Sequence, residues 1–193
     1  MQVATYTYNF KVTTDDNKTA STSITVKVAT AIGGPIYTYT GITLGAPTNS
    51  NVGSFFSTVV GTIYKEADAK TSASLVNIVF YVSGTTGFLA SPANTSAQNV
   101  FPSINSWTIK NLTDFKPTSA EMNATVFDGL TGDNKIIGEY DGETSVPESK
   151  TAALTVGKVV SFKTHNNKLG LIKVTSISTD VNGTITFDVK VQK

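Results

Sequence analysis

The sequence predicts a mostly β protein, a β-sandwich-like domain with one short helix, preceded by a β-hairpin. Three observations lead to this fold class. Segments in which apolar and polar residues alternate recur along the chain, most clearly at residues 6–28 and 184–191. The chain contains 31 Thr residues, and this β-branched residue suits the exposed face of a strand. Clusters of Asn, Asp and Gly, which favour turns, separate the alternating segments.

Composition and charge exclude several classes of protein. Charged residues make up only 15% of the chain, and the formal net charge is +1. All fifteen basic residues are Lys and no two are adjacent, so the clustered basic surface that nucleic-acid binding requires is missing. No apolar run has the length of a membrane span, and the absence of Cys excludes disulfides and thiolate metal sites. We therefore expect no nucleic-acid partner and no membrane span within this chain.

Residues 6–28 predict a β-hairpin with one apolar face. Seven large apolar residues alternate with polar ones on either side of a polar turn at 13–19: Tyr6, Tyr8, Phe10, Val12, Ile24, Val26 and Val28. A lone hairpin is marginally stable in water, so more sheet is needed to cover that face. Gly33-Gly34-Pro35 is a strong turn signal within a predicted linker over 29–36. We place the domains at residues 1–32 and 36–193.

The second domain begins with further strand patterns. Residues 36–42 alternate, and the apolar segment 55–64 fits either a strand or a short helix. Residues 75–82 are an almost continuous apolar run of strand length, which is typical of a central strand covered on both faces. Residues 88–117 carry few strand signals and are interrupted by three prolines.

The last third of the chain contains the predicted helix and three strands. Pro117 followed by Thr118 and Glu121 has the spacing of a capping box, which predicts a helix over about 118–129. Residues 131–150 are acidic and rich in turn formers. Strands are then predicted at 158–164, 169–177 and 184–191.

Two resemblances concern the origin of the chain. The segments Tyr6–Val12 and Thr19–Val28 resemble the last two strands of a bacterial immunoglobulin-like or polycystic-kidney-disease-like module, which implies that the other strands lie upstream in a longer protein. Residues 36–191 resemble domains of unknown function in Bacteroidetes cell-surface lipoproteins, through Asn77–Tyr81, Gly87–Pro92, Val160–Thr164 and Gly170–Val174. This second resemblance implies a location at the cell surface or outside the cell, at the outer membrane of a Gram-negative bacterium. It implies no reaction.

Aromatic and amide side chains are the candidate ligand-binding residues. Trp107, the only Trp, lies in an irregular segment close to Asn105, and Tyr37 and Tyr39 share one face of a strand. Exposed rings beside amide groups can bind sugars by stacking and hydrogen bonding. The competing interpretation is that Trp107 fills the core beneath a long loop, and the sequence favours it.

The other candidate functional groups are carboxylates. Six acidic residues cluster between 128 and 148, and Asp128 with Asp133 could hold Ca²⁺, although the spacing of a calcium loop is absent. Two of the six could instead serve a glycosidase. A solvated acidic loop is the simplest interpretation of the whole stretch. His165, the only His, is predicted to be an exposed turn residue.

The expected function is non-catalytic: a cell-surface or secreted module for adhesion, glycan binding or structural spacing. Its partners would be a glycan or a surface protein, and an unpaired sheet edge could make it oligomeric. We expect no cofactor, with Ca²⁺ as the one ion the acidic residues could accept. The alternative is a fragment of a carbohydrate-active enzyme that uses paired carboxylates.

Overall fold

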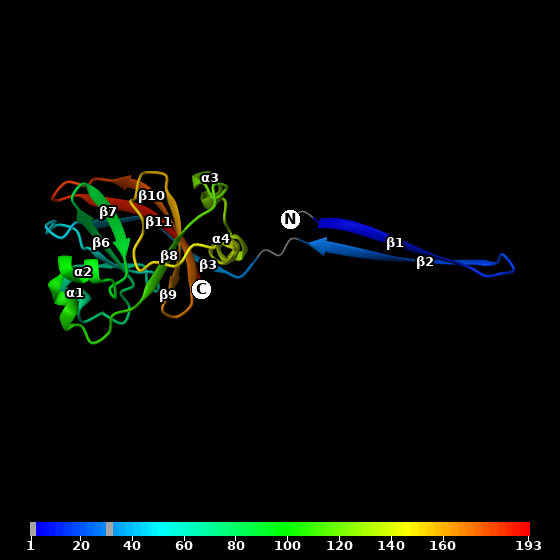
Figure 1. Ribbon diagram of the computed structural model, residues 1–193, viewed down its shortest axis with the longest axis horizontal. Coiled ribbons are helices and arrows are strands. Elements are labelled where there is room, and N and C mark those ends of the chain that lie inside the picture. The colour runs from blue at the N-terminus through cyan, green and yellow to red at the C-terminus, as the bar shows by residue number, and fades with distance from the viewer. Residues whose placement is uncertain (1–2, 30–32) are drawn as a thin grey trace. The chain divides into compact units, whose positions relative to one another are not determined.

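The computed structural model describes residues 3–29 and 33–193 and divides the chain into two compact units, Met1–Ile32 and Gly33–Lys193 (Figure 1). The predicted fold class is confirmed, because both units are built mainly from antiparallel strands. The predicted linker over 29–36 includes residues 30–32, which lie outside the described residues. Among the described residues, no helix has the length and apolar character needed to cross a membrane.

The first unit is a two-stranded antiparallel hairpin of β1 (Val3–Thr13) and β2 (Thr19–Ala29). The turn between them is closed by a 2.9 Å hydrogen bond from the Thr14 amide to the Lys18 carbonyl. Asn17 takes the left-handed conformation there, with φ of 59°, and Asn tolerates that region better than most residues. The predicted alternation therefore produces the predicted hairpin.

The globular unit, Gly33–Lys193, contains two antiparallel sheets. Five strands form the larger sheet in the order β3-β11-β10-β9-β8, and four form the smaller one in the order β5-β4-β6-β7. The strands are β3 (Ile36–Gly45), β4 (Phe55–Ser57), β5 (Thr62–Tyr64), β6 (Ile78–Ser83), β7 (Thr86–Ala90), β8 (Thr113–Pro117), β9 (Val159–Thr164), β10 (Leu169–Ile177) and β11 (Thr184–Gln192).

The main hydrophobic core lies between the two sheets. Phe162, Ile172 and Phe187 of the larger sheet meet Phe56 and Phe80 of the smaller one, and all five are fully buried. Face-to-face packing of two antiparallel sheets is the architecture of a β-sandwich.

Strand β6 is covered on both faces, as its continuous apolar sequence predicted. Ile78 and Phe80 face the larger sheet, whereas Val79 and Tyr81 belong to a second core on the opposite side. Because side chains alternate along a strand, burial on both faces requires apolar residues at successive positions.

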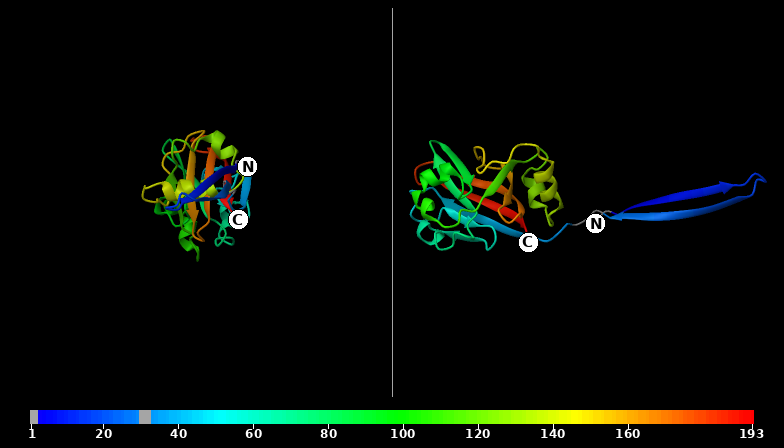
Figure 2. Two further views of the ribbon diagram at one scale, coloured as in Figure 1. Left: turned by 90° about the vertical axis from the view of Figure 1, so that its right-hand side faces the viewer. Right: turned by 60° about the horizontal axis from the view of Figure 1, so that its bottom comes forward.

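Short helices cover the outer faces of the sandwich (Figures 1 and 2). The second core places α1 (Glu66–Ala69), α2 (Thr95–Val100) and the 3₁₀ helix η1 (Pro102–Ser106) on the smaller sheet. A third core joins α3 (Ala124–Asp128) and α4 (Asn134–Gly142) to the larger sheet. These helices give the sandwich two additional outer layers.

The predicted helix begins later than its sequence signal. The Thr118 hydroxyl donates to the Val159 carbonyl instead of capping a helix, and α3 starts after Asn123, whose side chain accepts from the Val126 amide. The residues before Asn123 follow the end of β8 at Pro117 and form a turn. The capping-box prediction was therefore wrong in position, because an Asn cap five residues further on defines the helix start.

Candidate functional site

Residues 144–157, which we call the crossing segment, connect the outer edges of the two sheets. Phe115 of β8 donates its amide to the Glu148 carbonyl at 2.7 Å and accepts from the Glu148 amide at 3.0 Å. Further along, the Thr151 amide donates to the Leu89 carbonyl of β7 at 2.8 Å, and the Thr151 hydroxyl accepts from the Leu89 amide at 3.1 Å. These hydrogen bonds, three between backbone groups and one to the Thr151 hydroxyl, fix the crossing segment at one side of the sandwich.

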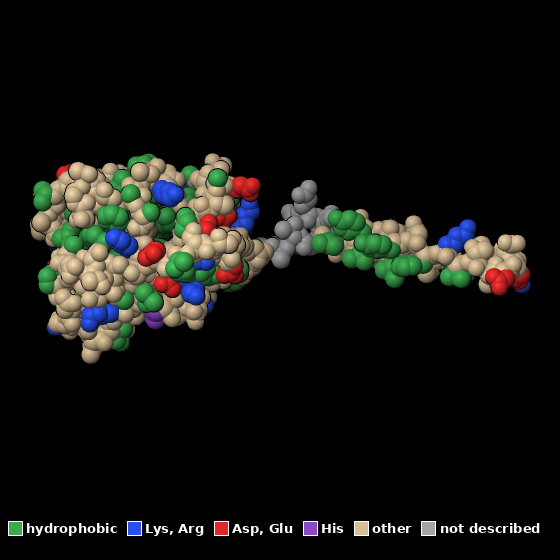
Figure 3. All heavy atoms as spheres, in the orientation of Figure 1, with side chains coloured by type: hydrophobic (Ala, Val, Ile, Leu, Met, Phe, Trp, Pro, Cys, Tyr) green, Lys and Arg blue, Asp and Glu red, His purple; other side chains and the backbone are tan. Residues whose placement is uncertain are grey.

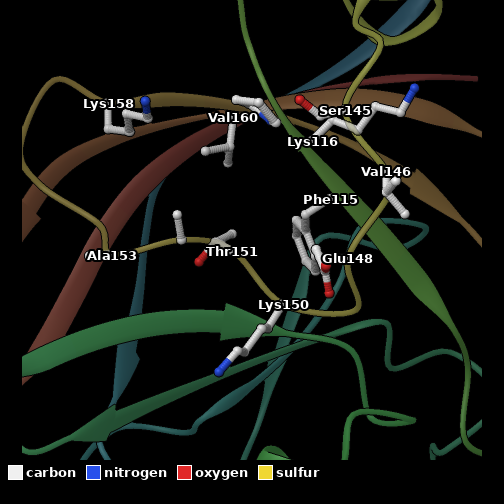
Figure 4. A pocket seen from close by; sticks show the side chains of 12 residues that line it. Phe115, Lys116, Ser145, Val146, Glu148, Lys150, Thr151, Ala153, Lys158 and Val160 are labelled. Carbon is white, nitrogen blue, oxygen red and sulfur yellow. The ribbon is translucent and has the colours of Figure 1, made fainter.

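A hollow of about 220 Å³ lies between the crossing segment and the strands β8 and β9 (Figure 4). Phe115 and Val160, both buried, belong to the main core and also line this hollow. Its volume is below the roughly 300 Å³ at which pockets for drug-sized ligands begin, so it suits a single ring or side chain. Its lining residues are Phe115, Lys116, Pro117, Ser145, Val146, Glu148, Lys150, Thr151, Ala152, Ala153, Lys158 and Val160.

Two of the three lysines that line the hollow have their amines engaged elsewhere. Lys116 donates to the Tyr140 and Glu143 carbonyls at 3.1 and 2.8 Å, and the Lys150 amine lies 5.0 Å from the centre of the Phe88 ring. Their side-chain stems contribute apolar surface to the hollow, as long lysine side chains commonly do.

Lys158 and Glu148 carry the available charges of the hollow. Within the described part of the chain, neither the Lys158 amine nor the Glu148 carboxylate has a hydrogen-bond or ion-pair partner, and both residues are exposed. In Figure 4 the two side chains border different sides of the hollow. The site therefore combines an apolar floor with one free cation and one free anion.

Tyr37 and Tyr39 lie on β3, where a second, smaller hollow of about 170 Å³ is lined by Tyr37, Val59 and Asn166 among others. The two rings are nearly parallel, with centroids 6.1 Å apart, and Tyr37 is 42% exposed. However, the Lys193 amine lies 5.0 Å from the centre of the Tyr37 ring. The predicted pair is thus brought together at the surface, but a sugar would have to share or displace these contacts.

Trp107 and Asn105 do not form a surface site together. Trp107 is 3% exposed and its ring centroid lies 5.4 Å from that of Phe55 in the second core, whereas Asn105 is exposed. Phe101, Ile104 and Trp107 are spaced by three residues, and a 3₁₀ helix places such residues on one side. The core interpretation of Trp107 therefore agrees with its position, and the ring offers no free face for stacking.

Asp128 and Asp133 bind different partners. The Asp133 carboxylate accepts from the Gly34 amide at 2.5 Å and from the Gln192 side chain at 2.8 Å. Asp128 forms an ion pair with Lys173, which is itself nearly buried. The structure does not bring the two carboxylates together, and among the described residues no group of three or more Asp, Glu, His or Cys side chains could hold a metal ion.

Lys173 shows how strongly this acidic region is tied to the larger sheet. Its amine also lies 3.1 Å from the Asp188 carboxylate. Burial alone would lower the pKa of Lys173, but the hydrogen bonds to Asp128 and Asp188 outweigh it, so the pKa is raised. This cluster is structural, since it holds α3 against β10 and β11.

Other predicted carboxylates have local hydrogen bonds. Glu139 accepts from the Ser119 amide and hydroxyl, both at 2.9 Å. Glu143 accepts from the Ser145 amide and hydroxyl at 2.9 and 2.7 Å, and these bonds lower its pKa. His165 lies exposed in the turn between β9 and β10, where the sequence placed it.

Comparison with known proteins gives a fold and no activity. A search of protein-family models finds no match to this chain, and a search of curated proteins finds none either. The chain is similar in structure to a DUF4466 family protein from Parabacteroides merdae, with a TM-score of 0.60 and 12% sequence identity. The likeness covers 97% of this chain and 62% of that protein. It therefore supports a shared fold with a protein from the Bacteroidetes whose function is unknown.

Sequence reasoning did not find the hollow. Its two free charges, Glu148 and Lys158, stand ten positions apart in a turn-rich stretch, and its floor residue Phe115 lies more than thirty positions earlier. The backbone pairing of the crossing segment with β8, together with the pairing of β8 with β9, brings them together. The sequence carries no local signal for such a pairing.

Proposed function

We propose that the globular unit is a non-catalytic glycan-binding module of a cell-surface or secreted protein, and that one sugar ring occupies the hollow beneath the crossing segment. The observation that carries the proposal is the combination of an apolar floor with the free Glu148 carboxylate and the free Lys158 amine. A sugar ring presents C–H groups on its face, and these can lie against Phe115 and Val160. Its hydroxyls can donate to a carboxylate and accept from an ammonium group.

The number of carboxylates supports a non-catalytic role. Most glycoside hydrolases require two carboxyl groups that flank the scissile bond. Among the described residues that line the hollow, Glu148 is the one carboxylate, and Glu139 and Glu143 accept hydrogen bonds from nearby serines. We therefore prefer binding to hydrolysis for this site.

The charges also favour a glycan over the two other roles that the sequence suggested. An apolar side chain of a partner protein could fill the floor, but it would leave the Glu148 and Lys158 side chains without partners. A structural spacer would need neither the hollow nor its free charges. Placement at the cell surface is supported by the resemblance of residues 36–191 to surface lipoprotein domains.

The test is binding of a panel of neutral oligosaccharides (gluco-, manno-, xylo- and galacto-oligosaccharides of several units) measured by isothermal titration calorimetry. We expect at least one to bind, and Glu148→Gln and Lys158→Met each to weaken binding about tenfold, because a hydrogen bond to a charged group contributes about 1.5–3 kcal/mol. Matched controls are Glu121→Gln and Lys70→Met, which change exposed residues outside the hollow.

The panel can also contradict the proposal. Binding that survives both Glu148→Gln and Lys158→Met unchanged would place the glycan elsewhere. Absence of binding to every oligosaccharide would favour adhesion to a protein or a spacer role.

A second location for a glycan is the exposed ring of Tyr37. The specific observation in its favour is the parallel pair with Tyr39 beside the smaller hollow. Aromatic rings stack on sugar faces, so Tyr37→Ala would abolish binding at this location and leave binding beneath the crossing segment unchanged. The same calorimetric titration distinguishes the two sites.

A further inference from the structure

The apolar face of the N-terminal hairpin is uncovered in the first unit. The register sets Tyr6 opposite Val26 and Tyr8 opposite Ile24, so the aromatic row of β1 and the aliphatic row of β2 lie on the same face. Figure 3 shows these side chains gathered along one side of the hairpin. Seven large apolar residues are each 41–65% exposed: Tyr6, Tyr8, Phe10, Val12, Ile24, Val26 and Val28.

The two faces of the hairpin differ sharply in polarity. The residues that alternate with the apolar ones, and therefore point the other way, are Thr, Ser, Asn and Lys. Charged residues lie on that opposite face, at Lys11 and Lys27, or in the turn. The apolar face thus has no charge that a buried interface would leave unpaired.

The exposed area is large enough for a specific interface. Three aromatic and four aliphatic side chains that are about half exposed present on the order of 600 Å² per hairpin. Two such faces together would bury about 1,200 Å², which is the lower end of the range for stable protein–protein interfaces. A two-stranded sheet needs such a partner, because it is marginally stable alone.

We propose that this face packs against the same face of a second copy of the chain, so that two hairpins form a four-stranded β-sandwich. Sheets that pack face to face lie about 10 Å apart. A two-fold axis parallel to the strands would set the aromatic row of β1 in one copy against the aliphatic row of β2 in the other. Large side chains would then face smaller ones on both sides, which allows the rows to interdigitate.

A second copy suits this face better than a polar or charged partner, because the face is uncharged and complementary to itself. The competing occupant is an apolar sheet from another part of a longer polypeptide, such as the remaining strands of an immunoglobulin-like module. That occupant would leave the chain of residues 1–193 monomeric, so the oligomeric state distinguishes the two.

The experiment compares the wild-type chain with Tyr8→Lys and Asn9→Lys by sedimentation velocity over a concentration series. Both substitutions add one positive charge to neighbouring positions of β1, but Tyr8 lies on the apolar face and Asn9 on the polar one. We expect a wild-type dimer, an unchanged dimer in Asn9→Lys, and at least about tenfold weaker dimerisation in Tyr8→Lys. Emission from Trp107, which lies in the core of the globular unit, verifies that this unit remains folded.

A cross-link locates the interface. The chain has no Cys, so Thr22→Cys on the apolar face and Ser23→Cys on the polar face can each be treated with a short bis-maleimide. We expect cross-linked dimers from Thr22→Cys and few from Ser23→Cys. A monomeric wild type, a dimer that Tyr8→Lys leaves intact, or equal cross-linking at both positions, as strand-edge pairing would give, would overturn the proposal.

Discussion

Phe115 and Glu148 exchange two backbone hydrogen bonds, of 2.7 and 3.0 Å, although 32 residues lie between them in the sequence. The bonds use main-chain groups alone, so the Glu148 side chain is left free to face a ligand. Backbone pairing of this kind holds a site more rigidly than side-chain contacts on a loop. The shape of the hollow is therefore set by the sheet edge, and its specificity by the side chains at its border.

Two glycines with left-handed backbones differ in the space around them. Gly61 has φ of +68°, and a Cβ there would lie 2.4 Å from Cε1 of Tyr39. Gly84 has φ of +61° and no heavy atom within 4 Å of such a Cβ. We expect Gly84→Ala to cost about 1 kcal/mol of unfolding free energy from backbone strain. Gly61→Ala should cost a further 1–3 kcal/mol, roughly, because the Tyr39 ring must move.

Urea unfolding of both variants measures this difference. Equal losses would show that the Tyr39 ring shifts without cost and that β3 tolerates movement at its aromatic pair.

Asn111 is a buried hydrogen-bond donor that organises the loop before β6. Its side-chain amide donates to the carbonyls of Ala73, Ser74 and Val76 at 3.2, 2.9 and 2.8 Å. Asn111→Asp keeps the shape but replaces the donor with a group that repels these carbonyls, so we expect a loss of about 3 kcal/mol in unfolding free energy. The exposed Asn105→Asp, measured by the same urea titration, should change it by less than about 0.5 kcal/mol. A small effect at Asn111 would mean that the loop rearranges.

Tyr140 makes the stability of the globular unit sensitive to high pH. Burial, helped by the charges of Asp114 and Asp141, raises the pKa of Tyr140 to about 12, whereas an unfolded tyrosine titrates near pH 10. As pH rises from about 10 to about 12, the unfolded chain releases a proton that the folded chain retains. The unfolding free energy should therefore fall, by at most about 1.4 kcal/mol per pH unit from this group.

Below pH 10 Tyr140 is protonated in both the folded and the unfolded chain, so its contribution to the unfolding free energy is fully present. Tyr140→Phe should remove it, so the variant should lose less stability than the wild type between pH 10 and 12 in parallel urea titrations. Identical slopes of unfolding free energy against pH for the two proteins would contradict a raised pKa of Tyr140. Because the two proteins share every other ionisable group, the difference between their slopes isolates the effect of Tyr140.

Alternating and continuous apolar patterns predicted most of the strands, because burial on one or both faces restricts which residues can stand at each position. The alternation in β11 and the continuous apolar run of β6 are examples. Strand β8 and most of β7 were missed, because they fall in residues 88–117, where the sequence showed few strand signals. Helix α4 was missed, although Ile136 and Tyr140 stand four residues apart and both are buried. The glycines and acidic residues around them indicated turns. The segment forms a helix because its packing against β9 and β10 outweighs these local turn signals.

The candidate site was the least predictable part. Trp107 was a candidate for sugar stacking, but the sequence favoured a core position, and its three-residue spacing from Ile104 agrees with that position. Of the predicted aromatic residues, Tyr37 and Tyr39 alone lie together near a hollow. The hollow beneath the crossing segment depends on long-range backbone pairing, which has no sequence signature.

Chemical-shift mapping by NMR, with the isotope-labelled chain titrated with an oligosaccharide from the neutral panel, reports directly which residues a bound glycan contacts. If the hollow is the binding site, the largest amide shifts will fall in residues 145–153 and at Val160. Shifts confined to Tyr37, Val59 and Lys168, or no shifts with any member of the panel, would contradict the assignment of the glycan to the hollow beneath the crossing segment.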